Sequence, residues 1–284
     1  MSLTTPLSNA DATIVAAGIW TGINTETKIA GLTNQSYSGQ LQGIGSQVKI
    51  ITIDGGDDLH EYVPADPEDG FNALDLEIVT DDSVWVKADQ AAYFNVAIDR
   101  VVAAAGATDH LRLKAEAKGK KAALKIDTYI ASVWAADAGV DLGTAVDLSA
   151  EGAAYDYLLD SLVLFEGNGT DLVAVGSQAF INSLIRDRRF TQGTPAGQAA
   201  LYNGVIGEAG GITVVKSNVQ GADTVLMRSH REAVASVKTV DEVTRYELGA
   251  AGFGEAVKGL IVYGAKIVHP ECAGAGTVVF TSGD

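Results

Sequence analysis

The stretch from Thr108 to Trp134 constrains the fold more than any other part of the chain. It is rich in Ala, Leu and Lys, all strong helix formers. Gly119 inside it costs about 1 kcal/mol relative to Ala, so we expect a bend or a close contact there. The stretch predicts a long amphipathic helix. Its apolar face, at close to helical spacing, is made up of Leu113, Ala117, Ala123, Ile126, Ile130 and Val133.

A second face of this helix carries four lysines. They are Lys114, Lys118, Lys121 and Lys125, spaced four, three and four residues apart. This spacing places the four ammonium groups in one row. Like charges so placed repel by a few tenths of a kcal/mol per pair, so an acidic surface alongside would stabilise the row. From the helix alone, both a solvated lysine face and a surface for an acidic partner stay open.

Residues 46–87 predict a long β-hairpin. A β-branched run ends at Ile53, and Leu74, Leu76 and Ile78 later alternate with acidic residues, which is strand periodicity. Eleven Asp or Glu residues and no Lys or Arg lie between positions 54 and 82. A two-stranded ribbon is only marginally stable alone, so this one is expected to lie against the lysine row. Its candidate contact residues are Asp57, Asp58, Glu61, Asp66, Glu68 and Asp69.

Residues 1–40 are poor in apolar side chains and predict a loosely structured arm. Trp20 is expected to be exposed until another surface or another subunit buries it. The alternative is an N-terminal helix that packs on the core of its own chain.

The remaining segments predict an apolar connector followed by a mixed unit. The connector covers residues 88–106, and Ser177 is expected to cap a helix that contains Phe180 and Leu184. A helix should also run from about Tyr155 to Phe165, and a strand from Asp171 to Val175. Strands are then expected at Ile212–Val215, Thr224–Met227, Val234–Val237, Leu260–Tyr263, Ile267–Val268 and Thr277–Phe280. This order indicates an α+β fold, because helices and strands do not alternate regularly.

Composition excludes several classes of protein. A net charge of −16 disfavours tight DNA wrapping and docking on anionic lipid. The one cysteine, Cys272, rules out an internal disulfide and suits a reducing compartment. No run of about 18 apolar residues predicts a transmembrane helix, and the N-terminus lacks the features of a signal peptide. A hydrophobic content of 47% predicts a substantial core.

No catalytic motif is present. The chain lacks a P-loop, a GxGxxG match, a nucleophile elbow and HExxH. Its four histidines are scattered without the spacing of metal ligands. The acidic turn around Asp54 lacks the order of an EF-hand, so a solvated turn is favoured over a calcium site. We therefore predict no enzyme activity, no cofactor and no metal.

Three segments carry a resemblance to a known family. They are Gly45-Ser-Gln-Val-Lys-Ile50, the glycine-punctuated passage from Leu201 to Asn218, and the strand pair from Phe253 to Glu271. In this order, with the hairpin and the long helix, the chain resembles the major capsid protein of tailed bacteriophages, which has the Hong Kong 97-type fold. The resemblance covers essentially the full chain, and the ordered set of segments carries it.

The resemblance implies a division of the chain. Residues 1–45 match an N-terminal arm, 46–87 the E-loop hairpin, and 88–200 mainly the P-domain with its spine helix at about 108–137. Residues 201–284 match mainly the A-domain and the returning C-terminal strands. It also implies assembly into hexamers and pentamers of an icosahedral shell, built in the host cytoplasm, that encloses double-stranded DNA. Scaffolding, portal and decoration proteins are further partners of such a virion; a membrane is not.

Two other functions remain open on the sequence. An encapsulin has the same fold but encloses protein cargo. A soluble α+β enzyme would need a convergent polar pocket, and no spacing of residues in the sequence indicates one.

Overall fold

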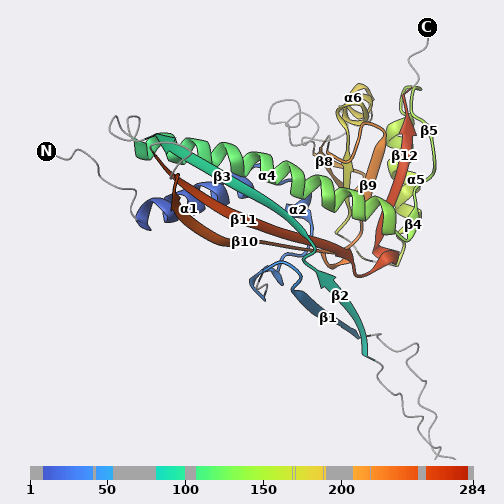
Figure 1. The fold of residues 1–284 in the computed structure, drawn as a ribbon. Helices are drawn as coiled ribbons and strands as arrows, with labels where there is room; N and C mark the ends of the chain where they lie inside the picture. The colour runs from blue at the N-terminus through green and yellow to red at the C-terminus, as the bar shows by residue number, and fades with distance from the viewer. Residues whose placement is uncertain are drawn as a thin grey trace, which may run out of the picture.

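The computed structural model describes residues 9–40, 43–53, 81–99, 107–167, 169, 171–187, 189, 207–217, 219–248 and 254–280. These residues form an elongated helix-and-sheet layer that continues into a second unit, which is built on another sheet (Figure 1). The predicted α+β class is confirmed. The helices are α1 (Asn9–Glu26), α2 (Ile29–Leu32), α4 (Ala107–Asp137), α5 (Ala153–Leu164) and α6 (Gln178–Arg186).

The long helix α4 confirms the main prediction, but its buried face differs in part. Ala123, Ile126 and Ile130 are buried as expected, and Trp134 joins them. Leu113 was assigned to the apolar face and is instead 56% exposed. Ala117 is also exposed. The buried face of α4 instead begins at Ala115, between these two residues, where α1 packs against α4.

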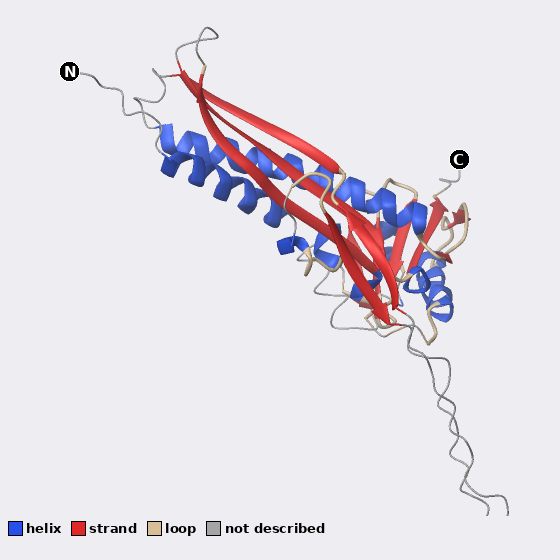
Figure 2. Ribbon diagram, turned by 60° about the horizontal axis from the view of Figure 1, so that its bottom comes forward, coloured by secondary structure: helices blue, strands red, loops and turns tan. Residues whose placement is uncertain are grey.

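For the described residues of the N-terminus, the structure confirms the alternative, a helix that packs on the core of its own chain, and not the loose arm. Helix α1 has 18 residues and packs along α4, with Val15, Ile19 and Ile23 fully or almost fully buried (Figure 2). The two backbones approach closely at glycines. A Cβ added at Gly119 of α4 would lie 2.4 Å from the carbonyl oxygen of Ile19, so the expected close contact at this glycine is confirmed.

Three long strands cover one side of this helix pair. They form a sheet of order β10-β11-β3, in which all neighbours are antiparallel. Residues 88–99 are thus not a connector, because β3 pairs with a strand far along the chain. The predicted strand at Leu260–Tyr263 and Ile267 of the next predicted strand belong to one strand, and Val268 follows its end. The bounds are β3 (Gln90–Asp99), β10 (Val234–Glu247) and β11 (Gly254–Ile267).

The predicted hairpin has its base in β1 (Gln47–Ile53) and β2 (Asp81–Lys87), which pair antiparallel from Gln47 with Lys87 to Ile53 with Asp81. Ile50 and Val86 on one face are buried against Val237 and Val262 of the three-stranded sheet. The ribbon leaves the body of the molecule at this point (Figure 1).

The second unit is a seven-stranded sheet of order β4-β12-β9-β6-β8-β7, with β5 also paired to β12. Helices α5 and α6 share a core with it through Leu158, Phe180 and Leu184. The predicted cap of α6 is confirmed, because the N–H of Phe180 donates to Ser177 Oγ at 3.4 Å. The strands are β4 (Val140–Asp141), β5 (Val146–Asp147), β6 (Val173–Gly176), β7 (Glu208–Ala209), β8 (Ile212–Lys216), β9 (Thr224–Arg228) and β12 (Ala273–Val279).

Candidate subunit-assembly surface

The predicted lysine row exists on the surface of α4. Lys114, Lys118, Lys121 and Lys125 are all exposed, whereas Ile126 of the same helix is buried in the core. Within the part of the chain that the structure describes, no carboxylate forms an ion pair with any of these four lysines. The row is therefore positive surface that its own described chain leaves unneutralised.

A hollow of about 330 Å³ lies beside this row. It separates the lysine face of α4 from strand β3. Its lining consists of Asn95, Val96 and Ala97 on β3 and Lys114, Ala117, Lys118 and Lys121 on α4. An apolar floor with three ammonium groups around it suits an extended acidic chain better than a small neutral molecule.

A buried carboxylate on α4 holds the start of α2. Asp127 is 1% exposed and accepts hydrogen bonds from the N–H groups of Lys28, Ile29 and Ala30, at 2.7, 3.3 and 3.0 Å. These are the first N–H groups of α2, which have no partner within that helix. Burial raises the pKa of Asp127, while the three hydrogen bonds and the nearby charge of Lys238 oppose the rise.

The other predicted interface residues have different outcomes. Trp20 is not freely exposed, because it is partly buried against the central core. Asp57, Asp58, Glu61, Asp66, Glu68 and Asp69 lie outside the described residues. The structure adds two residues that the sequence reasoning did not select: Ile51 and Trp85 are 60% and 49% exposed on the outer face of the β1–β2 ribbon. Strand alternation relative to Ile50 and Val86 would have pointed to both.

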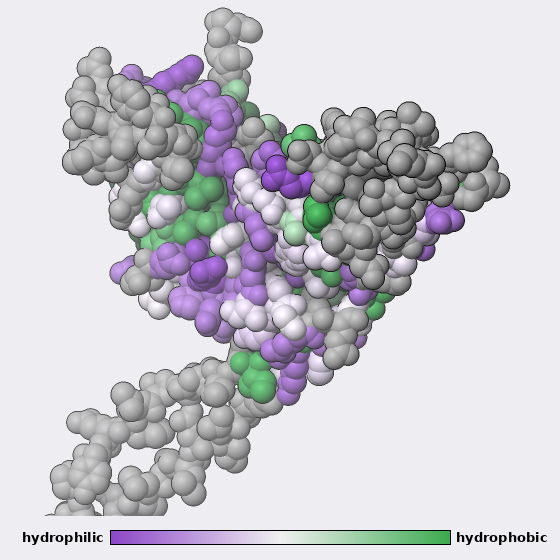
Figure 3. Space-filling view, turned by 90° about the vertical axis from the view of Figure 1, so that its left-hand side faces the viewer, coloured by the Kyte–Doolittle hydropathy of each residue, from purple (hydrophilic) through white to green (hydrophobic). Residues whose placement is uncertain are grey.

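Large exposed apolar residues are otherwise spread over several elements. In the view of Figure 3, hydrophilic surface separates the green apolar patches. Tyr93 on β3 is the most exposed of the large apolar residues, at 84%, and Val163 at the end of α5 follows at 68%. A contact with another molecule is thus better indicated at β3 and the ribbon than over one broad face.

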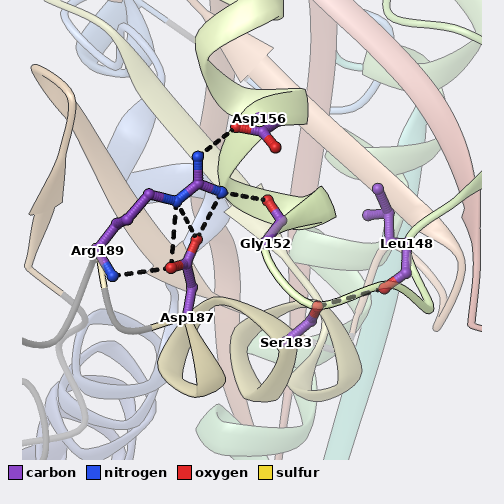
Figure 4. Close-up of polar contacts among 6 residues, drawn as sticks. All are labelled: Leu148, Gly152, Asp156, Ser183, Asp187 and Arg189. Carbon is purple, nitrogen blue, oxygen red and sulfur yellow. Dashed lines mark hydrogen bonds and ion pairs between the residues drawn. The ribbon is translucent and has the colours of Figure 1, made fainter.

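Arg189 joins the two helices of the second unit (Figure 4). Its guanidinium contacts Asp156 Oδ1 at 2.7 Å and Asp187 Oδ2 at 2.9 Å, and it donates to the carbonyl of Gly152 at 3.1 Å. The hydrogen bond from Arg189 lowers the pKa of Asp156. The guanidinium of Arg189 is therefore bound by groups of its own chain.

We expect Arg189→Lys to lower the midpoint of thermal unfolding by a few degrees. Lysine keeps the charge, but its single ammonium group cannot contact Asp156, Asp187 and the Gly152 carbonyl together as the planar guanidinium does. Calorimetry of this variant beside Arg186→Lys, a matched change on the exposed surface of α6, checks the expectation. Equal midpoints for the two variants would contradict it.

The described residues contain no group of three or more His, Cys, Asp or Glu side chains placed to hold a metal ion. Burial raises the pKa of the Cys272 thiol, which disfavours the reactive thiolate. No described helix is long and apolar enough to cross a membrane.

No protein-family model matches the sequence, and no curated protein sequence matches it either. Solved structures do match the fold. A structure from Mycobacterium phage Che8 matches with a TM-score of 0.64 and 22% identity, over 90% of this chain and 92% of that one. The capsid structure of the cyanophage P-SCSP1u matches with a TM-score of 0.60 and 16% identity, over 87% and 85%.

The chain has the Hong Kong 97-type capsid fold. Another matching structure is a virus-like particle from Pyrococcus furiosus, with a TM-score of 0.59 and 12% identity over 93% of this chain and 98% of that one. In this capsid fold, the lysine row and the hollow beside β3 lie on the long helix, and the base of the acidic hairpin lies on the three-stranded sheet.

Proposed function

We propose that this protein is the major capsid protein of a tailed phage, a structural shell protein and not an enzyme. The observation that carries the proposal is the match of nearly the whole chain to phage capsid structures. Copies of the chain form hexamers and pentamers, and these close into an icosahedral shell around double-stranded DNA. The net charge of −16 suits a container that encloses DNA without gripping it.

The proposal keeps the division into N-terminal arm, E-loop, P-domain and A-domain at the boundaries given above. Scaffolding, portal and decoration proteins are its proposed partners, and the virion, assembled in the host cytoplasm, is its proposed location. Unlike a freely extended arm, helix α1 is part of the core.

The proposed contact between subunits joins the acidic hairpin of one copy to the lysine row of the next. A single exposed ion pair contributes only about 0–1 kcal/mol. The same contact repeated at every interface would steer association and set the register of the subunits. Weak individual contacts also let wrongly joined subunits separate before the shell closes.

We expect Lys118→Glu with Lys121→Glu to reduce the yield of assembled particles at least about tenfold, because both charges are reversed where acidic residues must dock. The free energy of unfolding should change by less than about 1 kcal/mol, since both side chains are exposed. Sedimentation velocity and denaturant unfolding measure the two effects. As a control, Lys28→Glu reverses the charge of an exposed lysine outside the row. Normal particles from the double variant would rule out the pairing.

A second candidate is an encapsulin-type compartment, because a virus-like particle from Pyrococcus furiosus is among the matching structures. The contents of particles made beside the phage packaging machinery separate the two candidates. Nuclease-protected double-stranded DNA supports the phage shell. A stoichiometric protein cargo with no protected DNA supports the compartment instead.

A further inference from the structure

Strand β3 has a free edge. Within the described residues, the sheet order β10-β11-β3 gives it β11 on one side and no strand on the other. The hollow beside it is lined by Val96, which is buried, and by Asn95 and Ala97, which are exposed on the opposite face of the strand. Because residues from both faces line the hollow, it opens onto the strand edge itself. An unpaired edge presents N–H and C=O groups to an incoming strand.

The two sides of this edge differ in chemistry. On the α4 side lie Lys114, Lys118 and Lys121. On the outer face of the sheet lies Tyr93, 84% exposed beside its cross-strand partner Leu260. A strand that added to β3 would send alternate side chains to these two sides. The edge thus fits a segment that alternates acidic and apolar residues.

We infer that the free edge of β3 binds residues 74–78 of a second copy of this chain as an added β-strand. The segment reads Leu-Asp-Leu-Glu-Ile. Asp75 and Glu77 face the lysine row, and Leu74, Leu76 and Ile78 cover Tyr93. The four steps from Leu74 to Ile78 along a strand span about 13.5 Å, and the seven steps from Lys114 to Lys121 along the helix span about 10.5 Å, so the strand is long enough to pass all three lysines that line the hollow. This inference rests on the proposed function and adds a backbone ladder to its charge pairing.

A peptide of residues 72–80 tests the ladder on unassembled full-length protein isolated by size exclusion. We expect measurable binding by fluorescence anisotropy, and at least about tenfold weaker binding after N-methylation of the backbone at alternate residues that face β3, because methylation removes the ladder donors and keeps every side chain. A scrambled peptide of the same composition is the control. Undiminished binding of the N-methylated peptide, or equal binding of the scrambled peptide, would overturn the inference.

Cross-linking tests the same contact between whole chains. In a Cys272→Ser background, chains with Tyr93→Cys are mixed with chains that carry one cysteine at each position from 74 to 78. Paired strands bring residues of the same face within disulfide reach. We expect disulfide-linked dimers from Leu74→Cys, Leu76→Cys or Ile78→Cys and none from Asp75→Cys or Glu77→Cys. Shells that form with no alternation in cross-linking would overturn the added strand while leaving the capsid function intact. Alternating cross-links without any shells would support the added strand and contradict the capsid function.

Discussion

Replacing Asp127 with alanine is expected to lower the free energy of unfolding by about 3–5 kcal/mol, because three N–H groups at the start of α2 lose their acceptor. Two of the three bonds are buried. Asp127→Asn keeps one oxygen acceptor and should cost less. Denaturant unfolding of both variants measures the difference.

The matched control is Asp137→Ala, near the end of the same helix. Asp137 pairs with Lys266 at 2.8 Å, but both side chains are more than 40% exposed, so its loss should cost less than about 1 kcal/mol. Equal losses for Asp127→Ala and Asp137→Ala would show that the buried carboxylate does not hold α2.

The pH dependence of Asp127 has a definite sign. Burial places its folded-state pKa above the unfolded value, so the folded chain binds more protons between the two pKa values. This contribution to the free energy of unfolding is complete below the unfolded pKa of about 3.9 and is lost as pH rises through the folded pKa. The stability of wild type relative to Asp127→Asn should therefore increase as pH falls from neutrality toward that value.

Gly119→Val is expected to lower the free energy of unfolding by about 3 kcal/mol or to prevent folding, since overpacking of a tight contact displaces backbone. Its Cβ would lie 2.4 Å from the Ile19 carbonyl oxygen and 3.0 Å from Gly22 Cα. Neither atom belongs to a flexible side chain, so α1 must move away from α4.

The same α1–α4 contact can be probed from the other helix. Gly22→Ala should also destabilise, because its Cβ would lie 2.5 Å from the Glu116 carbonyl oxygen. Gly31→Ala in α2 is the control, since nothing lies within 4 Å of a Cβ at that position. Thermal unfolding of the set checks the order. A Gly22→Ala protein as stable as Gly31→Ala would contradict the close crossing of the two helices.

Local patterns predicted the elements that local residues determine. The composition of α4 and the Ser177 cap of α6 were both readable from neighbouring residues. Helix α1 stayed one of two alternatives on the sequence. Val15, Ile19 and Ile23 have helical spacing, but the close contact with α4 at Gly18 and Gly22 depends on a partner helix far along the chain. Strand β3 was missed because it is completed only by β11, far along the chain.

The candidate surface was predicted only in part, because some of its features depend on local residues and others on contacts between distant parts of the chain. The lysine row follows from helical spacing alone, and the structure places it where the spacing predicts. The hollow beside it depends on where β3 lies relative to α4, which no local pattern contains. Asp127 looked like one more polar residue of a helix, because its three partners lie almost a hundred residues earlier.

Electron microscopy of the purified full-length protein, with sedimentation velocity on the same sample, tests the capsid assignment most directly. The account predicts closed shells or ring-shaped hexamers and pentamers, with a fast-sedimenting boundary that grows with concentration. Polyethylene glycol, which favours compact association by excluded volume, should increase the assembled fraction. A chain that sediments as a monomer at every concentration, with neither rings nor shells in the micrographs, would contradict the account.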